Sequence, residues 1–140
     1  MSKELILKAE EIVAQNTRDD SYCVLALIDA KGYPTASTIT VSKAKGIERL
    51  TFCTGVESNK AKRIANSNRA SVCFNKDGAY NVSLVGTIEI ITDPDVKKEM
   101  WYDGLVNHFS GPADPNYCVL QFITERYNLL VDWQGAEGTL

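Results

Sequence analysis

The long stretch Tyr80–Ile91 constrains the fold more than any other part of the chain. Val82, Leu84 and Ile88 recur at every second or fourth place, which is the pattern of a β-strand with one face in the core. Gly86 interrupts this face, and a glycine inside a strand indicates a bulge or a sharp bend, as a small barrel needs at its corners. The sequence therefore predicts a long, bent strand within a curved sheet.

Six further apolar runs predict strands, at 22–28, 35–41, 50–54, 70–74, 117–123 and 127–133. Helices are predicted at Ser2–Gln15, from Ser58, and from Asp93 with Pro94 in the first position. Because most neighbouring strands are joined by short turns, we expect a mainly antiparallel sheet. About seven twisted strands close into a small barrel with the helices packed outside. Residues 1–140 then form one mainly β domain, and the element order disfavours a doubly wound fold.

The stretch Phe52–Ile64 reads as the end of a strand, a polar turn and the first turns of a helix. A helix start carries unpaired N–H groups and a partial positive charge, so it can receive an anion. The hydroxyls of Thr54 and Ser58 and the ammonium of Lys60 could converge there as a phosphate cradle. The alternative interpretation is an ordinary capped helix with surface lysines.

The strand Thr35–Val41 favours β structure but is rich in hydroxyls. Such a strand can present side chains and a backbone edge to a polar ligand. The alternative is a solvent-facing strand stabilised by Thr–Thr pairs.

The amino-acid composition excludes several classes of binding partner. The net charge of −3 and the pI near 5.2 argue against a nucleic-acid or anionic-membrane surface, and no apolar run approaches a membrane span. The start of the chain lacks the apolar core of a signal peptide. The cysteines lie singly within apolar runs without ligand spacing, which indicates reduced thiols in the cytoplasm and no metal site: Cys23, Cys53, Cys73 and Cys118.

Four features in this order resemble the FMN-binding split barrels of the pyridoxamine 5′-phosphate oxidase-like family, and most closely its short general stress protein branch. The features are Asp29-x-x-Gly32-x-Pro34, Phe52-Cys53-Thr54 with Ser58-Asn59-Lys60, Gly86 with Trp101, and Trp133-Gln134-Gly135. Their spacing covers nearly the whole chain. The resemblance implies a six- to seven-stranded antiparallel split β-barrel.

The resemblance also implies a homodimer with FMN at its interface. Its phosphate would be held by Cys53, Thr54, Ser58, Asn59 and Lys60. The ribityl chain and the ring would run along Ser37, Thr38, Ile39 and Thr40. Asn81 and Trp133 would lie near the ring, and some of these groups would come from the second subunit.

The chain departs from the true oxidases where they bind a vitamin phosphate. The oxidases carry an arginine at the place of Ser37 and a lysine at the place of Ser42, and Lys43 could replace the latter only in part. Thr139 and Leu140 stand where the oxidases begin an Arg-Leu-His segment, and we expect the chain to end before any histidine. Because a phosphate ester requires cationic recognition, pyridoxamine phosphate is not the expected substrate.

Three functions remain open at the level of sequence. The first is an FMN-dependent oxidoreductase, whose flavin carries the electron chemistry. The second is a non-catalytic flavin- or haem-binding module for sensing or storage. The third is an interaction protein that has lost its cofactor. His108, expected near the end of the third helix, has no visible catalytic partner and is interpreted as structural. The charged run 95–99 is interpreted as a solvated helix face.

Overall fold

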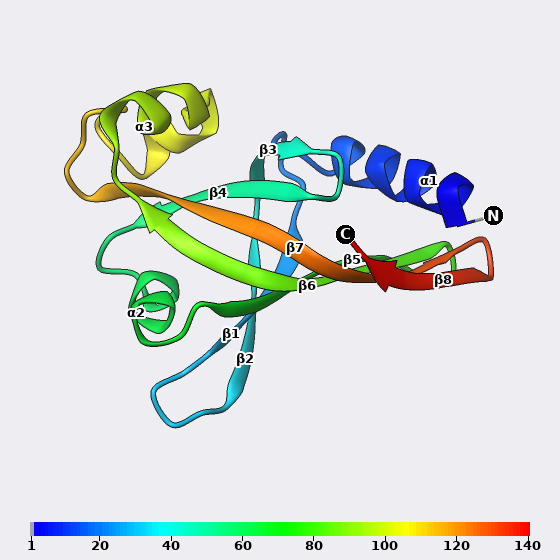
Figure 1. Ribbon diagram of the computed structural model, residues 1–140. Helices are drawn as coiled ribbons and strands as arrows, with labels where there is room; N and C mark the ends of the chain where they lie inside the picture. The colour runs from blue at the N-terminus through cyan, green and yellow to red at the C-terminus, as the bar shows by residue number, and fades with distance from the viewer. Residues whose placement is uncertain (1) are drawn as a thin grey trace.

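The computed structural model describes residues 2–140, which fold around one strongly curled antiparallel sheet (Figure 1). The elements, in chain order, are α1 (Ser2–Gln15), β1 (Cys23–Ile28), β2 (Pro34–Ile39), β3 (Val41–Lys45), β4 (Arg49–Gly55), α2 (Asn59–Asn66), β5 (Arg69–Lys76), β6 (Tyr80–Ile91), α3 (Pro94–Met100), the 3₁₀ helix η1 (Asp103–Asn107), β7 (Tyr117–Val131) and β8 (Gln134–Thr139). The predicted mainly β fold with antiparallel strands and outlying helices is confirmed. The sheet has eight strands rather than six or seven.

The strands follow the spatial order β2-β1-β5-β6-β7-β4-β3, so β2 and β3 lie at opposite ends of the sheet. Only Thr40 separates the end of β2 from the start of β3. Two outer strands joined by one residue must lie close together, so the sheet has to curl until its edges nearly meet. The strand predicted at 35–41 is therefore two strands with a corner at Thr40.

The long strand β7 organises the other half of the barrel. It pairs with β6 along one side, while its other side is shared by β4, over 117–123, and β8, over 126–131. The prediction of two separate strands at 117–123 and 127–133 is therefore wrong, and residues 134–139 form a further strand. The chain continues through Thr124–Arg126 because a bulge absorbs the bend, and it reverses at Asp132-Trp133. Both of these turn residues are left-handed, with φ of 52° and 65°.

The bulge predicted at Gly86 is present. The register with β7 shifts between Val85 and Gly86, so that Glu125 is the extra residue on the partner strand. A Cβ atom at Gly86 would run into the carbonyl of Ile123 and come within 3.1 Å of the amide nitrogen of Glu125. The glycine therefore allows the two backbones to approach at the point where the barrel bends.

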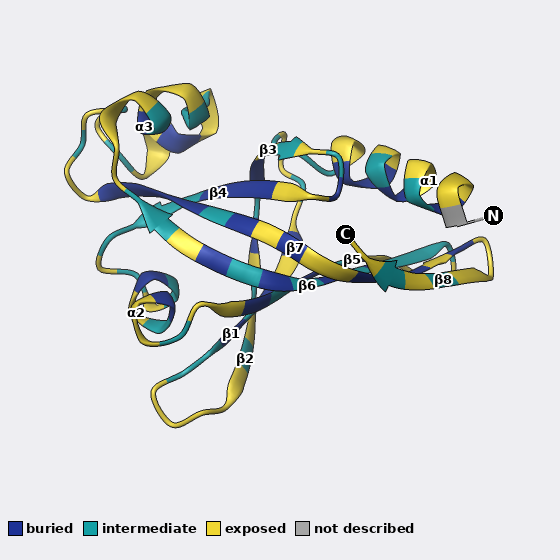
Figure 2. Ribbon diagram, viewed as in Figure 1, coloured by how far each residue is buried: buried dark blue, intermediate teal, exposed yellow. Residues whose placement is uncertain are grey.

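The core lies inside the curled sheet and is closed at one end by α1 (Figure 2). Leu25, Val72 and Leu84 stand opposite one another on β1, β5 and β6 and are fully buried. Ala9 and Val13 of α1 are fully buried against this core as well. Burial alternates along β5 and β6, so there the amphipathic pattern of the sequence sets which face packs, whereas β4 and the start of β7 are buried on both faces.

A smaller aromatic cluster lies under α3 and η1, away from the main core. The ring of Tyr117 contacts Trp101 and Phe109, with ring centroids 5.4 Å and 5.3 Å away. Lys97 is buried here and donates to the carbonyl of Asp114 at 3.0 Å, so the predicted solvated face is wrong at this position. His108 follows η1 rather than ending α3, because the chain leaves the helix at Trp101.

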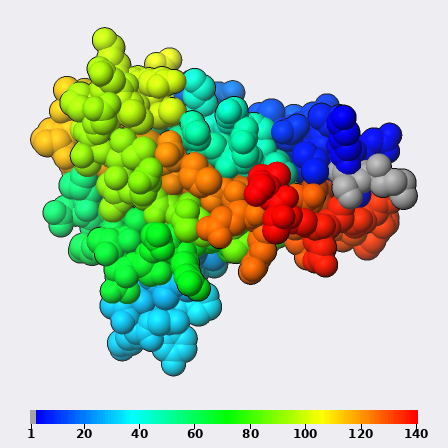
Figure 3. Space-filling model, viewed as in Figure 1, coloured from blue at the N-terminus to red at the C-terminus, as the bar shows by residue number. Residues whose placement is uncertain are grey.

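No helix of the described chain has the length and apolar character needed to cross a bilayer. The β1–β2 hairpin projects from the body of the molecule (Figure 3). The β7–β8 hairpin and α2 lie at opposite ends of the barrel (Figure 1).

We expect Gly86→Ala to lower the free energy of unfolding by about 1–3 kcal/mol, because the added methyl group forces the two backbones apart at the bulge. Urea unfolding followed by circular dichroism measures the loss. Gly111→Ala is the matched control, since a Cβ atom there meets nothing within 4 Å. Equal stability of the two variants would contradict the close-approach role of Gly86.

Candidate functional site

The start of α2 is ordered by two side-chain hydrogen bonds. Ser58 is the N-cap, and its Oγ accepts a hydrogen bond from the amide of Ala61 at 3.1 Å. The hydroxyl of Thr54 donates to the same Oγ at 3.0 Å, which fixes the end of β4 against the helix start. Because the Ser58 oxygen accepts both bonds, its own proton is free to donate outward. The predicted cap at Ser58 is confirmed.

The backbone N–H groups of Asn59 and Lys60 lie in the first turn of α2. Because the residues before them are not helical, these N–H groups have no acceptor within the helix. The Lys60 ammonium makes no ion pair with a described residue. Partial burial lowers the pKa of Lys60, and the positive charge of Arg63 lowers it further. An anion placed between these donors would offset both effects, because it favours the charged ammonium and satisfies the free N–H groups.

Beside this helix start lies a hollow of about 290 Å³. Its walls come from the β2–β3 corner, the end of β4 and the segment after α3: Thr40, Cys53, Thr54, Gly55, Tyr102, Leu105, His108 and Phe109. Burial raises the pKa of the Cys53 thiol, so this group stays protonated and acts as a wall rather than as a nucleophile. Its sulfur lies 3.6 Å from the Tyr117 hydroxyl oxygen and 3.6 Å from the carbonyl of Met100.

The polar strand leads into this hollow. Ser37 and Thr38 lie on β2, the outer strand of the sheet, where Ser37 is half-buried and Thr38 exposed. The side chain of Ile39 is buried in the core, so this residue could reach a ligand only through its backbone. Thr40 lines the hollow together with Cys53 and Thr54. The hollow therefore brings the corner of the polar strand together with Cys53 and Thr54, whereas Ser58, Asn59 and Lys60 of the predicted phosphate end do not line it.

Asn81 and Trp133 lie elsewhere. They share a small hollow of about 120 Å³ between the β5–β6 turn and the β7–β8 hairpin. Cys53 pairs with Val119 and Asn81 with Leu130, eleven residues further along β7. At about 3.3 Å a residue the path along β7 between the two places is about 36 Å, and the straight-line distance is shorter because the strand bends at the bulge. The residues that the resemblance assigns to the phosphate, Thr54–Lys60, thus lie apart from those that it assigns to the ring, Asn81 and Trp133; the two groups are called the phosphate half-site and the ring half-site below.

Ser42, which stands at the place of one missing cation, and its neighbour Lys43 both contact α3. Ser42 is only 1% exposed, and its hydroxyl donates to the carbonyl of Met100 at 2.6 Å. The Lys43 ammonium pairs with Glu99 at 3.1 Å, with both side chains more than half exposed. Exposed pairs of this kind contribute little to stability. The pair with Glu99 nevertheless directs the side chain of Lys43 toward α3.

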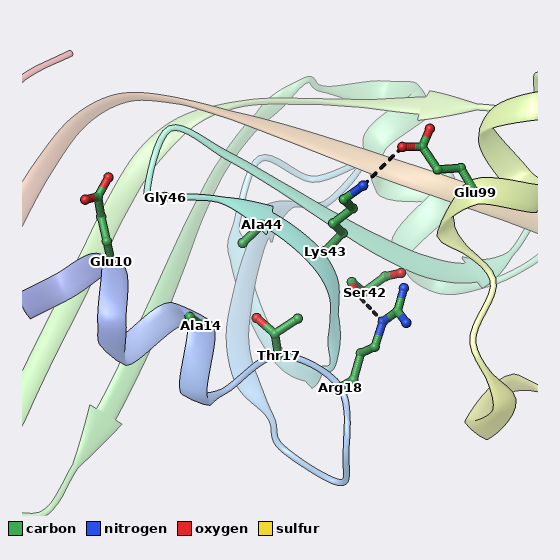
Figure 4. A pocket seen from close by; sticks show the side chains of 9 residues that line it. All are labelled: Glu10, Ala14, Thr17, Arg18, Ser42, Lys43, Ala44, Gly46 and Glu99. Atoms are coloured by element: carbon green, nitrogen blue, oxygen red, sulfur yellow. Dashed lines mark hydrogen bonds and ion pairs between the residues drawn. The ribbon is translucent and has the colours of Figure 1, made fainter. Parts of the chain in front are cut away.

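Two residues at this corner, Arg18 and Tyr102, are absent from the sequence-based site. Arg18 lies in the loop after α1, and its Nε donates to the carbonyl of Ser42 at 2.7 Å (Figure 4). Its guanidinium carbon lies 5.2 Å from the centroid of the Tyr102 ring. An open groove of about 410 Å³ runs from Arg18 past Lys43 toward Glu10 of α1. An arginine in a short polar loop carries no pattern that would have marked it.

The model of the pyridoxamine 5′-phosphate oxidase family matches residues 9–130. The chain belongs to this family. No curated protein sequence gives a significant match. Solved structures resemble the chain throughout its length. A protein from Clostridium acetobutylicum, described as related to general stress protein 26 of Bacillus subtilis and as of the pyridoxinephosphate oxidase family, superposes with a TM-score of 0.86. It is 22% identical, over 100% of this chain and 97% of that one.

Two other relatives of the fold bind different groups. A pyridoxamine 5′-phosphate oxidase-related, FMN-binding protein from Nostoc punctiforme has a TM-score of 0.68 at 14% identity, over 99% of this chain and 94% of that one. A haem-binding protein from Mycobacterium smegmatis has a TM-score of 0.75 at 16% identity, over 96% of this chain and 57% of that one. At these identities the likeness concerns the fold alone.

Proposed function

We propose that the protein is a cytoplasmic, homodimeric FMN-binding flavoprotein that acts as an oxidoreductase. The observation that carries the proposal is the start of α2, where the Ser58 cap is ordered by Thr54 and followed by Lys60, next in the chain to the hollow that Thr54 and Gly55 line. A terminal phosphate is the part of FMN that such a group of donors fits. Titration of the purified protein with FMN, followed in the visible flavin bands, tests the proposal directly.

Different residues of the chain fit different parts of FMN. Ser58, Asn59 and Lys60 would hold the phosphate, and Thr54 would orient Ser58. The corner at Thr40 would guide the ribityl chain toward the ring. FMN when bound supplies the electron transfer itself. The chain would bind and orient it, while the protonated thiol of Cys53 closes the wall of the hollow without reacting.

The two half-sites support a shared site in a dimer. The phosphate half-site and the ring half-site are eleven residues apart along β7 and line two hollows that share no residue, which supports a site completed by a second chain. A two-fold axis would bring the ring half-site of one subunit to the phosphate half-site of its partner, and the reverse contact would follow by symmetry. The exposed indole of Trp133 then gains a neighbour that its own chain does not provide.

The substrate we propose is not pyridoxamine phosphate. Ser37 and Ser42 provide no charge, and the Ser42 hydroxyl is already used on Met100. Lys43 is directed to Glu99 rather than into the hollow. A less charged electron donor suits these walls, which are formed by hydroxyl, thiol and aromatic groups.

A haem-binding role is the second candidate, because His108, the sole histidine of the chain, lines the hollow. An imidazole is a common axial ligand of haem iron. A shift of the haem Soret band when haem binds to the protein would favour this role over flavin binding, provided that the shift is lost in His108→Ala.

We expect Lys60→Ala to weaken FMN binding by about 1.5–3 kcal/mol, the range for hydrogen bonds to charged groups. Riboflavin, which lacks the phosphate, should be nearly indifferent to the change. Lys62→Ala is the matched control, since Lys62 is exposed two residues further along the same helix. Isothermal titration with both flavins measures the difference. Equal losses for FMN and riboflavin would contradict the phosphate assignment.

We expect the chain to form a dimer of about twice 15.5 kDa in light scattering, with each flavin held by both subunits. A complementation experiment tests the sharing. Homodimers of Lys60→Ala carry two damaged phosphate half-sites, and homodimers of Trp133→Ala carry two damaged ring half-sites. A purified heterodimer of the two variants has one doubly damaged site and one intact site. Half of its sites should bind FMN with wild-type affinity; no recovery would mean that each site lies within one chain.

We expect no useful oxidation of pyridoxamine phosphate by the FMN-loaded protein. The absence of two charged contacts at Ser37 and Ser42 should reduce kcat/KM by ~10³-fold or more relative to an oxidase. Formation of pyridoxal phosphate under oxygen is the assay. Turnover near 1 per second or above, within the ordinary enzymatic range, would show that another cation, Lys43 first, grips the substrate.

A further inference from the structure

We propose that Arg18 is a positioning residue that latches the segment 101–109 over the hollow at Cys53 and Thr54, so that Tyr102 forms a fixed wall of the flavin site. The latch is a property of the folded chain. Its effect on the flavin rests on the function proposed above.

Arg18 joins three elements that are distant in the sequence. Its backbone N–H donates to the carbonyl of Val41 at 2.9 Å, which ties the loop after α1 to the start of β3. Its Nε donates to the next carbonyl, that of Ser42, at 2.7 Å. The face of the guanidinium lies 5.2 Å from the centroid of the Tyr102 ring, within the range of a cation–π contact. The Arg18 side chain therefore contacts both the start of β3 and the segment after α3.

Apart from Arg18, the ring of Tyr102 is held by apolar packing against the cluster of Leu105, Tyr117 and Val119. The Tyr102 hydroxyl makes no hydrogen bond to any residue the structure describes. The attachments of α3 to the barrel, from Ser42 and Thr51, end at Met100. Beyond Tyr102 the chain is held by burial of Leu105 and by the contact of Phe109 with Tyr117. The ring of Tyr102 thus lies between two anchored regions, with Arg18 as its polar neighbour.

The backbone of Arg18 has an unfavourable conformation for an arginine. Its φ of 61° is left-handed, and Asp19 and Asp20 continue in the same region with φ of 50° and 62°. Aspartate tolerates this region better than arginine, which carries a longer side chain and gains no local hydrogen bond there. A strained residue of this kind persists only where the surrounding contacts determine it. The contacts present are a local hydrogen bond from the amide of Ser21 to the Arg18 carbonyl at 3.1 Å and the long-range contacts to Val41, Ser42 and Tyr102.

Release of the latch should therefore free Tyr102 and loosen the segment that follows it. Three amides report on that segment, because each donates a hydrogen bond within it: Leu105 to the Tyr102 carbonyl, and His108 and Phe109 to the Leu105 carbonyl, all at 3.0 Å. Hydrogen exchange at these amides in the flavin-free protein measures the latch without any ligand. Amides of Val72 and Leu84, in the core strands, measure global unfolding in the same sample.

The test compares Arg18→Gln, Arg18→Lys, Tyr102→Leu and Tyr102→Phe. We expect Arg18→Gln and Tyr102→Leu each to speed exchange at the three amides about tenfold, the loss of a charge-assisted contact. Arg18→Lys keeps a cation over the ring and should recover part of the protection, whereas Tyr102→Phe keeps the ring and should match the wild type. The double variant Arg18→Gln/Tyr102→Leu should exchange no faster than the faster single variant, because both remove the same contact.

Three results would overturn the latch. One is unchanged exchange in Arg18→Gln, another is an equal rise at Val72 and Leu84, and the third is a double variant whose effect is the product of the two single effects. These results do not depend on flavin. If the wild type binds no flavin, the proposed function fails and the exchange data still decide the latch.

The flavin arm tests the positioning role. If Arg18 acts through the Tyr102 wall, Arg18→Gln should weaken FMN and riboflavin by the same factor of about three to ten, with partial rescue by Arg18→Lys. A loss confined to FMN would show that Arg18 contacts the phosphate itself, and it would overturn the assignment of Arg18 as a positioning residue.

Discussion

The connection of two outer strands through Thr40 is the constraint on which the rest of the molecule depends. Since β2 and β3 occupy opposite edges of the sheet, one intervening residue forces the sheet to curl back on itself. The bulge at Gly86 allows the long strands to follow that curvature. The corner at Thr40 then becomes a meeting point for parts of the chain that no local interaction would bring together: the loop after α1, the end of β4 and the segment after α3.

The proposed site has two parts: a helix start formed by residues close in sequence, and a hollow formed by residues far apart in sequence. The helix start at Ser58 needs only a strand end, a turn and an amphipathic helix, and its hydroxyls are ordered by their own hydrogen bonds. The hollow beside it depends on the barrel, because its walls come from three separate regions. Burial of the aromatic cluster under α3 stabilises this region, and the ring contacts of Tyr117 with Trp101 and Phe109 add to it. That packing holds the walls in place without a disulfide or a metal.

The sequence was sufficient for the parts of the fold that follow from periodicity and caps. The face of β6, the bulge at Gly86, the cap at Ser58 and the Asp93-Pro94 helix start were all predicted correctly. The corner at Thr40 and the continuity of β7 were not, because a threonine and the polar run Thr124–Arg126 give no sign of where a strand bends or continues. Lys97 was misplaced since its burial depends on the Asp114 loop, which packs back from later in the chain. The contacts of Arg18 are likewise tertiary, so local pattern could not identify them.

The turn at Asp132-Trp133 has a spectroscopic consequence. The chain has two tryptophans, and they differ sharply in environment: Trp101 packs edge-on against Tyr117, whereas the indole of Trp133 is 78% exposed on its left-handed turn. The emission of Trp133 should therefore be that of an indole in water until something covers it, while that of Trp101 reflects the aromatic cluster. With Trp101 replaced by phenylalanine, the remaining fluorescence becomes a single intrinsic probe of whatever approaches the tip of the β7–β8 hairpin.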